Sequence, residues 1–370
     1  MDRLKICAWN IEHADKLWKA ASTPPVDRKI DARLDAVAEE IAHIDADVLF
    51  ISEGPGSEAA AEAFFARVAP AYRLVTRNST DWRDYQVRGT QWLWFLVRNT
   101  QTLTGELQHI DRWRTLTESA SEGDHRGGEW EVSYPVATPD FQSLSFKVPG
   151  RHSHYRHPQV LQLNVDGTHL ELIGCHLKSK INKVRVPGDP YAPDYFDRNP
   201  ALVADVIQSR IKLTTECSDI RHYIHARFTE DPEAPIIVLG DLNDCPGKER
   251  IEKRFLYHDL VSSLQGDVVL AGQFLNHALF DFPQEARWSY HLQGGDKLDP
   301  RRDPRILLDH IMFTQSLSGG GDTGTGSAWR ARAGGGQVEH DVHHRVASGR
   351  PKYAETSDHR PVSMVFDRRR

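Results

Sequence analysis

Short runs of apolar residues recur along the chain, and most of them end at a polar or turn-forming residue. Apolar runs of this length, bounded in this way, are typical of β-strands that are buried on both faces. The runs predict strands at about 4–10, 48–52, 72–76, 91–98, 158–165, 169–175, 235–239, 306–313 and 361–366.

Between these runs, apolar side chains recur at the spacing of a helix. One stripe, with steps of three and four residues, is formed by Ile30, Leu34, Val37, Ile41 and Ile44. Such a stripe covers one face of a helix. Ser57 is a predicted N-cap for a short helix, and Pro200 is predicted to open a long helix with Asn199 as its cap. Alternating strands and helices indicate an α/β layered fold.

Two segments lack a regular pattern. Residues 111–155 are rich in turn-forming and basic residues, and we expect an elaborated region over the functional site. Residues 318–336 contain runs of three glycines at 319–321 and 334–336, and we expect a flexible surface loop there. Because the polar residues of interest extend from position 10 to position 359, we expect residues 1–370 to form a single domain with insertions.

The overall charge of the chain bears on whether it binds nucleic acid. The formal net charge is −6. This balance gives no overall attraction to nucleic acid, so a basic binding surface has to be local. Two stretches are locally basic, namely Lys178, Lys180, Lys183 and Arg185, and then Arg301, Arg302 and Arg305. Solvated loops explain both stretches equally well.

The four cysteines are scattered without the spacing of a metal site, and we interpret them as free thiols that need no oxidising compartment. The start of the chain lacks the basic and apolar segments of a signal peptide. No apolar run approaches the roughly 20 residues that a transmembrane helix needs. We therefore expect a soluble, cytoplasmic protein. No motif identifies a protein partner.

Polar residues that could bind a metal ion or take part in catalysis stand at or near the ends of the predicted strands. They belong to the segments Trp9-Asn10, Glu53, His176-Leu177-Lys178-Ser179, Gly240-Asp241-Leu242-Asn243, Leu308-Asp309-His310 and Ser357-Asp358-His359. Carboxylate and amide oxygens are the ligands that Mg²⁺ and Mn²⁺ prefer. Histidines beside them suit contact with an anionic phosphate and the movement of a proton. The segments therefore predict a metal-dependent phosphoester hydrolase.

In this order, the segments resemble the endonuclease/exonuclease/phosphatase superfamily. That superfamily includes deoxyribonuclease-I-like nucleases, apurinic endonucleases, deadenylases, sphingomyelinases and inositol-polyphosphate 5-phosphatases. The resemblance spans nearly the whole chain. It implies an α/β fold in the form of a four-layer sandwich, with two packed mixed β-sheets flanked by helices. It also implies a Mg²⁺ or Mn²⁺ cofactor and in-line attack of a metal-activated water on a phosphate.

The resemblance also implies the metal-binding residues and the residues that handle the water. Glu53 matches the principal metal-binding glutamate, with Asn10 and Asp358 as further metal-binding residues. Asp241 matches the aspartate that orients or deprotonates the attacking water, and Asn243 the residue that positions water and phosphate. The structural alternatives are a strand-end cap for Asn10 and an Asx turn for Asp241 and Asn243.

The residues that contact the phosphate follow from the same resemblance. His359 matches the histidine at the scissile phosphate, and Asp309 the carboxylate that orients its ring. His176 matches a second phosphate-contacting histidine and proton donor. Lys178 and Arg156 are further candidates for binding the substrate phosphate. A solvated lysine is an equally good interpretation of Lys178.

The substrate stays open at this point. Inositol-polyphosphate 5-phosphatases carry a Trp-Cys-Asp-Arg-like stretch where this chain has Leu307-Leu308-Asp309-His310, which counts against that substrate class. The leading interpretation is a nuclease with a nucleic acid substrate. The alternative is a phosphodiesterase or phosphatase for a lipid headgroup or a small phosphorylated metabolite, which predicts a closed pocket built from residues 111–155. A non-catalytic binding protein is the third interpretation.

Overall fold

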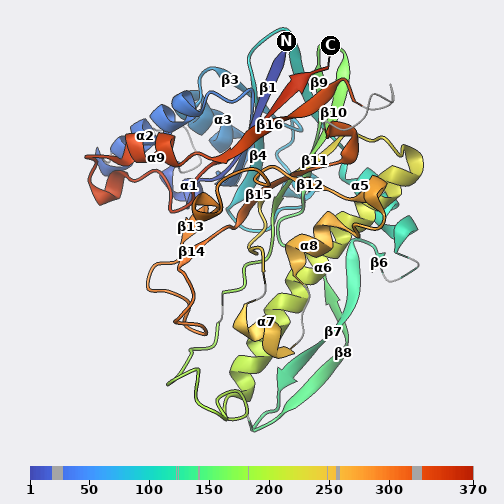
Figure 1. Ribbon diagram of the computed structural model, residues 1–370, viewed down its shortest axis with the longest axis vertical. Coiled ribbons are helices and arrows are strands. Elements are labelled where there is room, and N and C mark those ends of the chain that lie inside the picture. Colours follow the sequence, from blue (N-terminus) through green and yellow to red (C-terminus); the bar gives the residue numbers. More distant parts are fainter. Residues whose placement is uncertain are drawn as a thin grey trace.

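Two six-stranded β-sheets lie face to face between layers of helices in the computed structural model (Figure 1). The structure describes residues 1–18, 28–121, 123, 125–140, 142–181, 183–247, 249–255, 259–318 and 327–369. In spatial order, the first sheet consists of β16 (Trp329–Val338), β17 (Val362–Arg368), β1 (Arg3–Asn10), β2 (Val48–Gly54), β4 (Trp92–Arg98) and β3 (Tyr72–Val75). The second consists of β12 (Asn276–His277), β15 (Asp309–Phe313), β11 (Ile236–Asp241), β10 (Thr168–His176), β9 (Gln159–Val165) and β5 (Leu103–Leu107).

Both sheets are mixed. β1 is parallel to β2 and antiparallel to β17. β11 is parallel to β10 and antiparallel to β15. The sheets pack closely because glycines in the second sheet leave room for Phe50 of the first. A Cβ atom at Gly174 would lie 2.2 Å from the Phe50 ring, and one at Gly240 would lie 2.8 Å from it.

Helices cover the outer faces of both sheets (Figure 1). The first sheet carries α2 (Arg28–Ile44), α3 (Glu58–Val68) and α9 (His340–Ala347). The second carries α5 (Ile110–Ala120), α6 (Pro200–Glu230) and α8 (Leu260–Gln265). The other α-helices in the described part of the chain are α1 (Ala14–Leu17), α4 (Trp82–Tyr85) and α7 (Arg250–Phe255). No helix in the described part of the chain is long and apolar enough to cross a membrane.

Most of the expected elements are present, including the helices that begin near residue 30 and at Pro200. Ser57 caps α3 by accepting a hydrogen bond from the backbone amide of Ala60. Asn199 stands at the N-cap position of α6 but does not cap it, because its side chain donates to the carbonyl oxygen of Tyr195 instead.

The strand expected at 306–313 is divided between two sheets. β14 (Arg305–Ile306) pairs with β13 (Tyr290–His291) in a small separate ladder, and only Asp309–Phe313 joins the second large sheet. The division has a physical cause, since the Ser289 hydroxyl accepts hydrogen bonds from the backbone amides of Leu308 and Asp309. The chain therefore turns immediately before Asp309.

The region 111–155 is more regular than its sequence suggests. It contains α5 and a three-stranded sheet of β6 (His125–Arg126), β7 (Glu129–Ala137) and β8 (Leu144–His152). The β7–β8 hairpin lies along α6 and extends from the end of the molecule opposite the paired termini (Figure 1).

The expectation of a flexible loop across 318–336 is wrong for its second half. Residues 329–338 form β16 and pair with β17 at the edge of the first sheet. Gly336 is required there by close packing, because a Cβ atom would lie 1.8 Å from the carbonyl oxygen of Ala278. Residues 319–326, which include the first run of three glycines, lie outside the described residues.

Candidate active site

The strand ends bring the predicted polar residues to one edge of the sandwich. In the first sheet, Asn10 pairs with Ser52, directly before Glu53. In the second, Asp241 pairs with both His176 and Asp309. Parallel strands place their carboxyl ends at the same edge, so residues distant in the sequence become neighbours.

Asp241 lies at the centre of this group. Its Oδ2 atom accepts a hydrogen bond from Nδ2 of Asn10 at 2.9 Å and lies 3.4 Å from Nε2 of His176. Its Oδ1 atom accepts a hydrogen bond from the backbone amide of Asn243 at 2.8 Å. The amide of Asn10 also lies 3.4 Å from Oε1 of Glu53. One buried carboxylate therefore connects four of the predicted residues.

His359 is held by Asp309. The distance from Nδ1 of His359 to Oδ2 of Asp309 is 2.6 Å, and both side chains are buried. The Tyr290 ring packs on the imidazole with a centroid distance of 4.8 Å. The Ser357 hydroxyl accepts from the His359 backbone amide and donates to the Asn10 carbonyl oxygen. The ring is therefore fixed in orientation, with Nε2 as the nitrogen that Asp309 does not occupy.

Glu53 adopts a strained backbone conformation. Its φ angle of 59° lies in the left-handed region, which is uncommon for a residue other than glycine. Its carboxylate accepts hydrogen bonds from Nε2 of Gln91 at 2.5 Å and from the backbone amide of His13 at 2.9 Å. Gln91 also accepts a hydrogen bond from Arg156. Gln91 therefore links the Glu53 carboxylate to Arg156.

Burial and charge separate the protonation behaviour of the central groups. Burial raises the pKa of Asp241 to about 7, which favours its neutral form until a cation binds nearby. Burial also lowers the pKa of His176 well below its usual value, so this imidazole is neutral at physiological pH. Burial alone would lower the pKa of His359, but the charge and hydrogen bond of Asp309 raise it to about 10. His359 is therefore a cation facing the site.

The donor set fits a hard divalent cation. Ligand atoms of Asp241, Asp309 and His359 all lie within 4.8 Å of one another. Because His359 is protonated, only the two carboxylates of this trio are able to bind a cation. In the described residues, buried oxygens without a hydrogen-bond partner include Oδ1 of Asn10, Oδ1 of Asp309 and Oδ1 of Asp358. Buried oxygens that lack donors are costly unless a cation or water satisfies them. These oxygens lie among the residues predicted to bind metal or to handle water and phosphate.

A second acidic group already holds a cation supplied by the chain. Asp244, Cys245 and Glu249 also lie close together. The Lys180 ammonium donates to Asp244 at 2.5 Å and to Glu249 at 2.8 Å. The group is therefore a buried ion-pair cluster that anchors the segment after His176.

Three further predicted side chains make their hydrogen bonds outside the Asp241 carboxylate, and their roles stay predictions. Nδ2 of Asn243 donates to the carbonyl oxygen of Leu177, so it holds the segment that follows His176. Arg156 donates to the His176 carbonyl oxygen at 3.3 Å and reaches the site through Gln91. Lys178 does not contact Asp241, and its ammonium donates to the Ser179 carbonyl oxygen.

Sequence reasoning missed several residues that build the site. Gln91 fixes Glu53, Tyr290 packs on His359, and Ser289 sets the start of β15. The run Trp288-Ser289-Tyr290 contains none of the motifs that identified the other site residues. Gln91 stands directly before the apolar strand β4, and that position is the sequence signal that could have found it.

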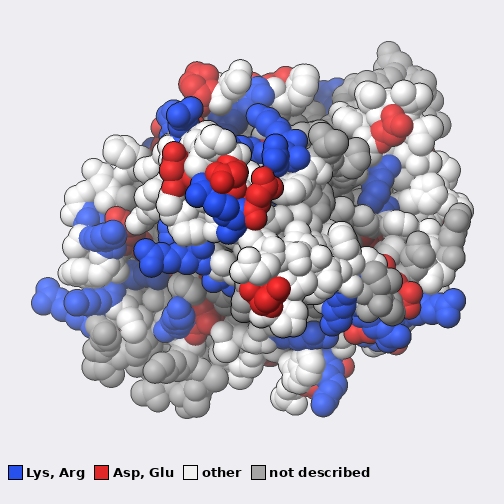
Figure 2. Space-filling view, turned by 90° about the horizontal axis from the view of Figure 1, so that it is seen from below, with Lys and Arg blue, Asp and Glu red and all other residues white. Residues whose placement is uncertain are grey.

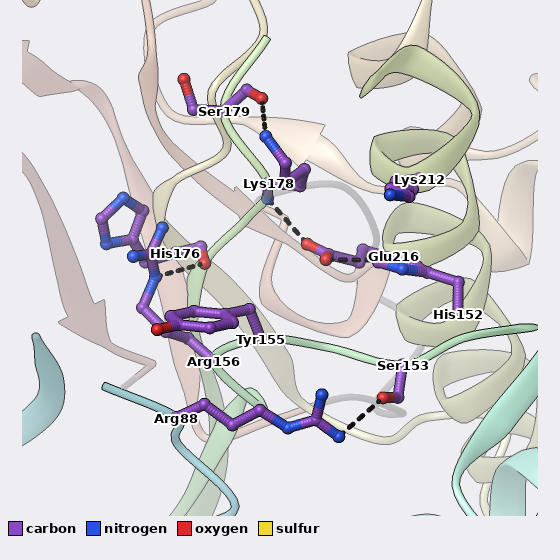
Figure 3. Close-up of a pocket in the computed structure, with 10 residues that line it drawn as sticks. All are labelled: Arg88, His152, Ser153, Tyr155, Arg156, His176, Lys178, Ser179, Lys212 and Glu216. Carbon is purple, nitrogen blue, oxygen red and sulfur yellow. Dashed lines mark hydrogen bonds and ion pairs between the residues drawn. The ribbon is translucent and has the colours of Figure 1, made fainter. Parts of the chain in front are cut away.

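A pocket of about 370 Å³ adjoins this group at His176 (Figure 3). It is lined by Arg88, His152, Ser153, Tyr155, Arg156, His176, Lys178, Ser179, Lys212 and Glu216. His152 and Ser153 come from the region 111–155, and Lys212 and Glu216 come from α6. The elaborated region therefore lies beside the candidate active site and forms one wall of a pocket.

The fold is similar to that of TDP2 from Caenorhabditis elegans, as seen in a crystal structure of the selenomethionine protein, with a TM-score of 0.50. The two sequences are 12% identical, and the match covers 99% of this chain and 74% of that chain. A D. rerio TDP2 complexed with a single strand DNA product is 12% identical over 99% of each chain, with a TM-score of 0.49. An endonuclease/exonuclease/phosphatase family protein from Bacteroides thetaiotaomicron is 11% identical over 100% of this chain and 98% of that chain, with a TM-score of 0.46. No family model matches the chain, and no curated protein matches it. The likeness to solved structures shows the fold, and the predicted α/β sandwich of two packed mixed sheets flanked by helices is confirmed.

Proposed function

We propose that this chain, which has the fold of the endonuclease/exonuclease/phosphatase superfamily, is a metal-dependent phosphodiester hydrolase. One observation carries the proposal. A buried Asp309–His359 pair faces a buried Asp241 that contacts Asn10 and His176. Phosphodiester hydrolysis needs a group that aligns a water, a cationic contact to the phosphate and a group that handles a proton, and Asp241, His359 and His176 are side chains of the kinds that suit these tasks.

We assign the water to Asp241. Its carboxylate is held from two sides, by Asn10 and by the Asn243 backbone amide, so it points in one direction. A carboxylate whose pKa is raised to about 7 is well matched to accepting a proton from water near neutral pH. Asn243 acts in this assignment by holding Asp241 and Leu177 in position.

We assign the scissile phosphate to His359 and His176. The His359 imidazolium donates from Nε2 to a phosphate oxygen, while Asp309 holds Nδ1. His176 is neutral and buried, and its Nε2 lies close to Asp241, so it can hold a proton for the leaving oxygen. Glu53, Asn10 and Asp358 remain the proposed metal-binding residues. A bound Mg²⁺ or Mn²⁺ supplies charge neutralisation at the phosphate oxygens.

A nucleic acid is our first candidate for the substrate. Lys178 lines the pocket beside the site, where it can contact a nucleic acid backbone, whereas Lys180 of the same stretch is held by three carboxylates. However, Lys and Arg are interspersed with Asp and Glu over the face seen in Figure 2, and they do not form one broad basic track there. A short oligonucleotide suits such a surface better than a long duplex, because duplex binding depends on many phosphate contacts.

A small phosphorylated metabolite or lipid headgroup is the second candidate. The pocket beside His176 is the observation that favours it, because residues 152 and 153 of the region 111–155 line that pocket. A volume of about 370 Å³ is in the range of sites that enclose small ligands.

The test is hydrolysis by protein that has been stripped with a chelator and then titrated with Mg²⁺ or Mn²⁺. Substrates are single-stranded DNA, duplex DNA, RNA and bis(p-nitrophenyl) phosphate. We expect turnover only after metal addition, and the best polynucleotide or small ester identifies the substrate class. Equal turnover with and without metal would overturn the metal-dependent proposal, and metal binding without any turnover would favour a binding protein.

A further inference from the structure

Four cations converge on the pocket next to the candidate active site (Figure 3). Arg88 comes from the loop before β4, Arg156 follows β8, Lys178 follows β10, and Lys212 lies on α6. His176 lies on the wall shared with the catalytic group, because its Nε2 is 3.4 Å from Asp241. The pocket and the proposed scissile phosphate are therefore neighbours on either side of one imidazole.

The positive charge of this pocket is not balanced by ion pairs. In the part of the chain that the structure describes, none of the four cations has a carboxylate oxygen within 4.0 Å. Their hydrogen bonds go to neutral oxygens, namely those of Ser153 for Arg88, His176 and Gln91 for Arg156, Ser179 for Lys178 and Gln208 for Lys212. Lys180, two residues beyond Lys178, contrasts with them because it contacts three carboxylates.

Among the described residues that line the pocket, Glu216 is the single carboxylate, and it has a structural task. Glu216 accepts hydrogen bonds from Nε2 of His152 at 3.0 Å and from the Lys178 backbone amide at 2.7 Å. It thereby connects α6 to the end of β8 and to the segment after β10, and it is 3% exposed. The oxygens of Glu216 are used inside the wall, so the opening of the pocket presents mainly cationic groups.

Hydrogen bonds of Asp219 also hold the pocket wall in place on the side away from the opening. Asp219, one turn further along α6, accepts hydrogen bonds from Trp113 and Trp130 at 2.8 and 2.9 Å. It also lies 2.8 Å from Nε2 of His154. These contacts attach α5, β7 and the segment after β8 to one helix. A cationic pocket with fixed walls is prepared for an anion, since little ordering remains to be done on binding.

We propose that this pocket binds a second phosphate group of the substrate, next to the phosphate that is hydrolysed. The inference rests on the proposed function, because the second phosphate is defined relative to the scissile one. Guanidinium groups match the planar pair of oxygens on a phosphate, and ammonium groups add compact charges. The second phosphate comes either from the end of an oligonucleotide or from a small metabolite with two phosphates, and the chemistry of recognition is the same.

The first experiment measures binding of inorganic phosphate to the metal-free protein by calorimetry. The catalytic group contains the His359 cation as well as carboxylates, so phosphate binding is assigned to the pocket only where a pocket variant weakens it. Lys212→Glu is the test variant, and Arg88→Glu is a second one if the first unfolds.

Lys147→Glu is the matched control. Lys147 and Lys212 both place their ammonium groups over the Tyr134 ring, at 5.8 and 5.4 Å from its centroid, but only Lys212 lines the pocket. We expect Lys212→Glu to weaken phosphate binding by about tenfold or more, the effect of losing one charge-assisted hydrogen bond. We expect Lys147→Glu to bind as the wild type does. No binding to wild type, or equal binding by all variants, would overturn the proposal.

The second experiment identifies the source of the phosphate. Dithymidine monophosphate is compared with its 5′-phosphorylated form as a substrate, and fructose 1,6-bisphosphate is tested as a competitor. A lower KM for the phosphorylated dinucleotide that is lost in Lys212→Glu supports a nucleotide end. Competition by the bisphosphate that is lost in the same variant supports a small metabolite. If the enzyme is active and shows neither of these two effects, the inference is overturned.

The two proposals fail in different ways. Phosphate binding that depends on Lys212, in a protein that hydrolyses no phosphodiester, would contradict the proposed function alone. Metal-dependent hydrolysis that is insensitive to a second phosphate, together with phosphate binding that is insensitive to Lys212→Glu, would contradict the inference alone.

Discussion

Asp309 and Asp241 are both fully buried carboxylates, yet their surroundings assign them different tasks. Asp309 contacts Nδ1 of His359 and holds the imidazole in one orientation. Asp241 contacts a neutral amide and a neutral imidazole, and burial raises its pKa to about 7. The first carboxylate therefore positions a cation, and the second is placed to accept a proton.

Replacing Asp309 tests this division. We expect Asp309→Asn to lower kcat by about 10- to 100-fold, as is usual for a group that acts through a neighbour. His359→Ala should lower it further, since the phosphate contact itself is lost. In Asp309→Asn the pKa of His359 should fall from about 10, because the raising charge is removed while burial still lowers it. NMR titration of the imidazole measures that shift, and an unchanged titration would contradict the pairing.

Residue-level prediction from the sequence succeeded where a polar side chain ends an apolar strand. Asn10, His176 and Asp241 were recognised in this way, and the structure brings them together. Gln91 and Tyr290 were not assigned roles because their partners, Glu53 and His359, are distant in the sequence. Only the three-dimensional fold makes those contacts visible. The catalytic and metal-binding roles of the predicted residues stay predictions.

At the scale of elements, α6 connects the β7–β8 hairpin to the candidate active site. Asp219 is the centre of that connection, with hydrogen bonds to two tryptophans and His154. Burial alone would raise the pKa of Asp219, but the hydrogen bond and charge of His154 lower it to about 2. Burial alone would likewise lower the pKa of His154, but Asp219 raises it.

Replacing Asp219 should therefore destabilise the protein in a pH-dependent manner. We expect Asp219→Asn to lower the free energy of unfolding by about 3–5 kcal/mol near pH 5, the usual cost of breaking a buried pair. The Asp219 carboxylate contributes fully to the free energy of unfolding above its unfolded-state pKa of about 4. It loses this contribution as the pH falls toward its folded-state pKa of about 2. The His154 contribution is present below about pH 6.5 and is lost as the pH rises through its raised pKa.

Urea unfolding of wild type and Asp219→Asn at pH 3, 5 and 8 measures this difference. Glu230→Gln is the control on the same helix, because Glu230 is exposed and its ion pairs contribute little. A difference in stability that does not shrink toward pH 3 would show that Asp219 does not act as an ionised partner of His154.

The edge strand β16 illustrates where local pattern misleads. Glycine runs are typical of flexible loops, but Gly336 lies in a strand against the Ala278 backbone. The packing partner is 58 positions away in the sequence, so no local signal separates this glycine from a loop glycine. The β7–β8 hairpin was missed for a similar reason, since its strands are stabilised by packing on α6.

Gly336→Ala should destabilise the first sheet. The added Cβ atom would meet the Ala278 carbonyl oxygen at 1.8 Å, so the two segments must move apart. We expect a loss of about 1–3 kcal/mol or more in the free energy of unfolding, as for overpacked sites. Gly272→Ala is the control, because a Cβ atom there meets nothing within 4 Å. Equal stability of the two variants in thermal unfolding would contradict the close approach.

At the scale of the whole molecule, two mixed sheets deliver residues from positions 10 to 359 to one edge. The α/β sandwich was predictable because six polar segments occur in an order that resembles one superfamily. The substrate was not predictable, because the pocket beside the site combines Lys178 with Arg88 and Lys212, which belong to none of those segments. Its position next to His176 makes it the region that selects the substrate in this account.

The measurement that tests the central claim most directly is Mg²⁺-dependent product formation by wild type and by Asp241→Ala. Substrates are bis(p-nitrophenyl) phosphate, single-stranded DNA, duplex DNA and RNA, and thermal unfolding confirms that the variant is folded. We expect wild type to cleave at least one substrate and the variant to lose about 10²-fold or more of kcat, the contribution of a positioned base. Full activity in folded Asp241→Ala would contradict the assignment of this cluster as the active site.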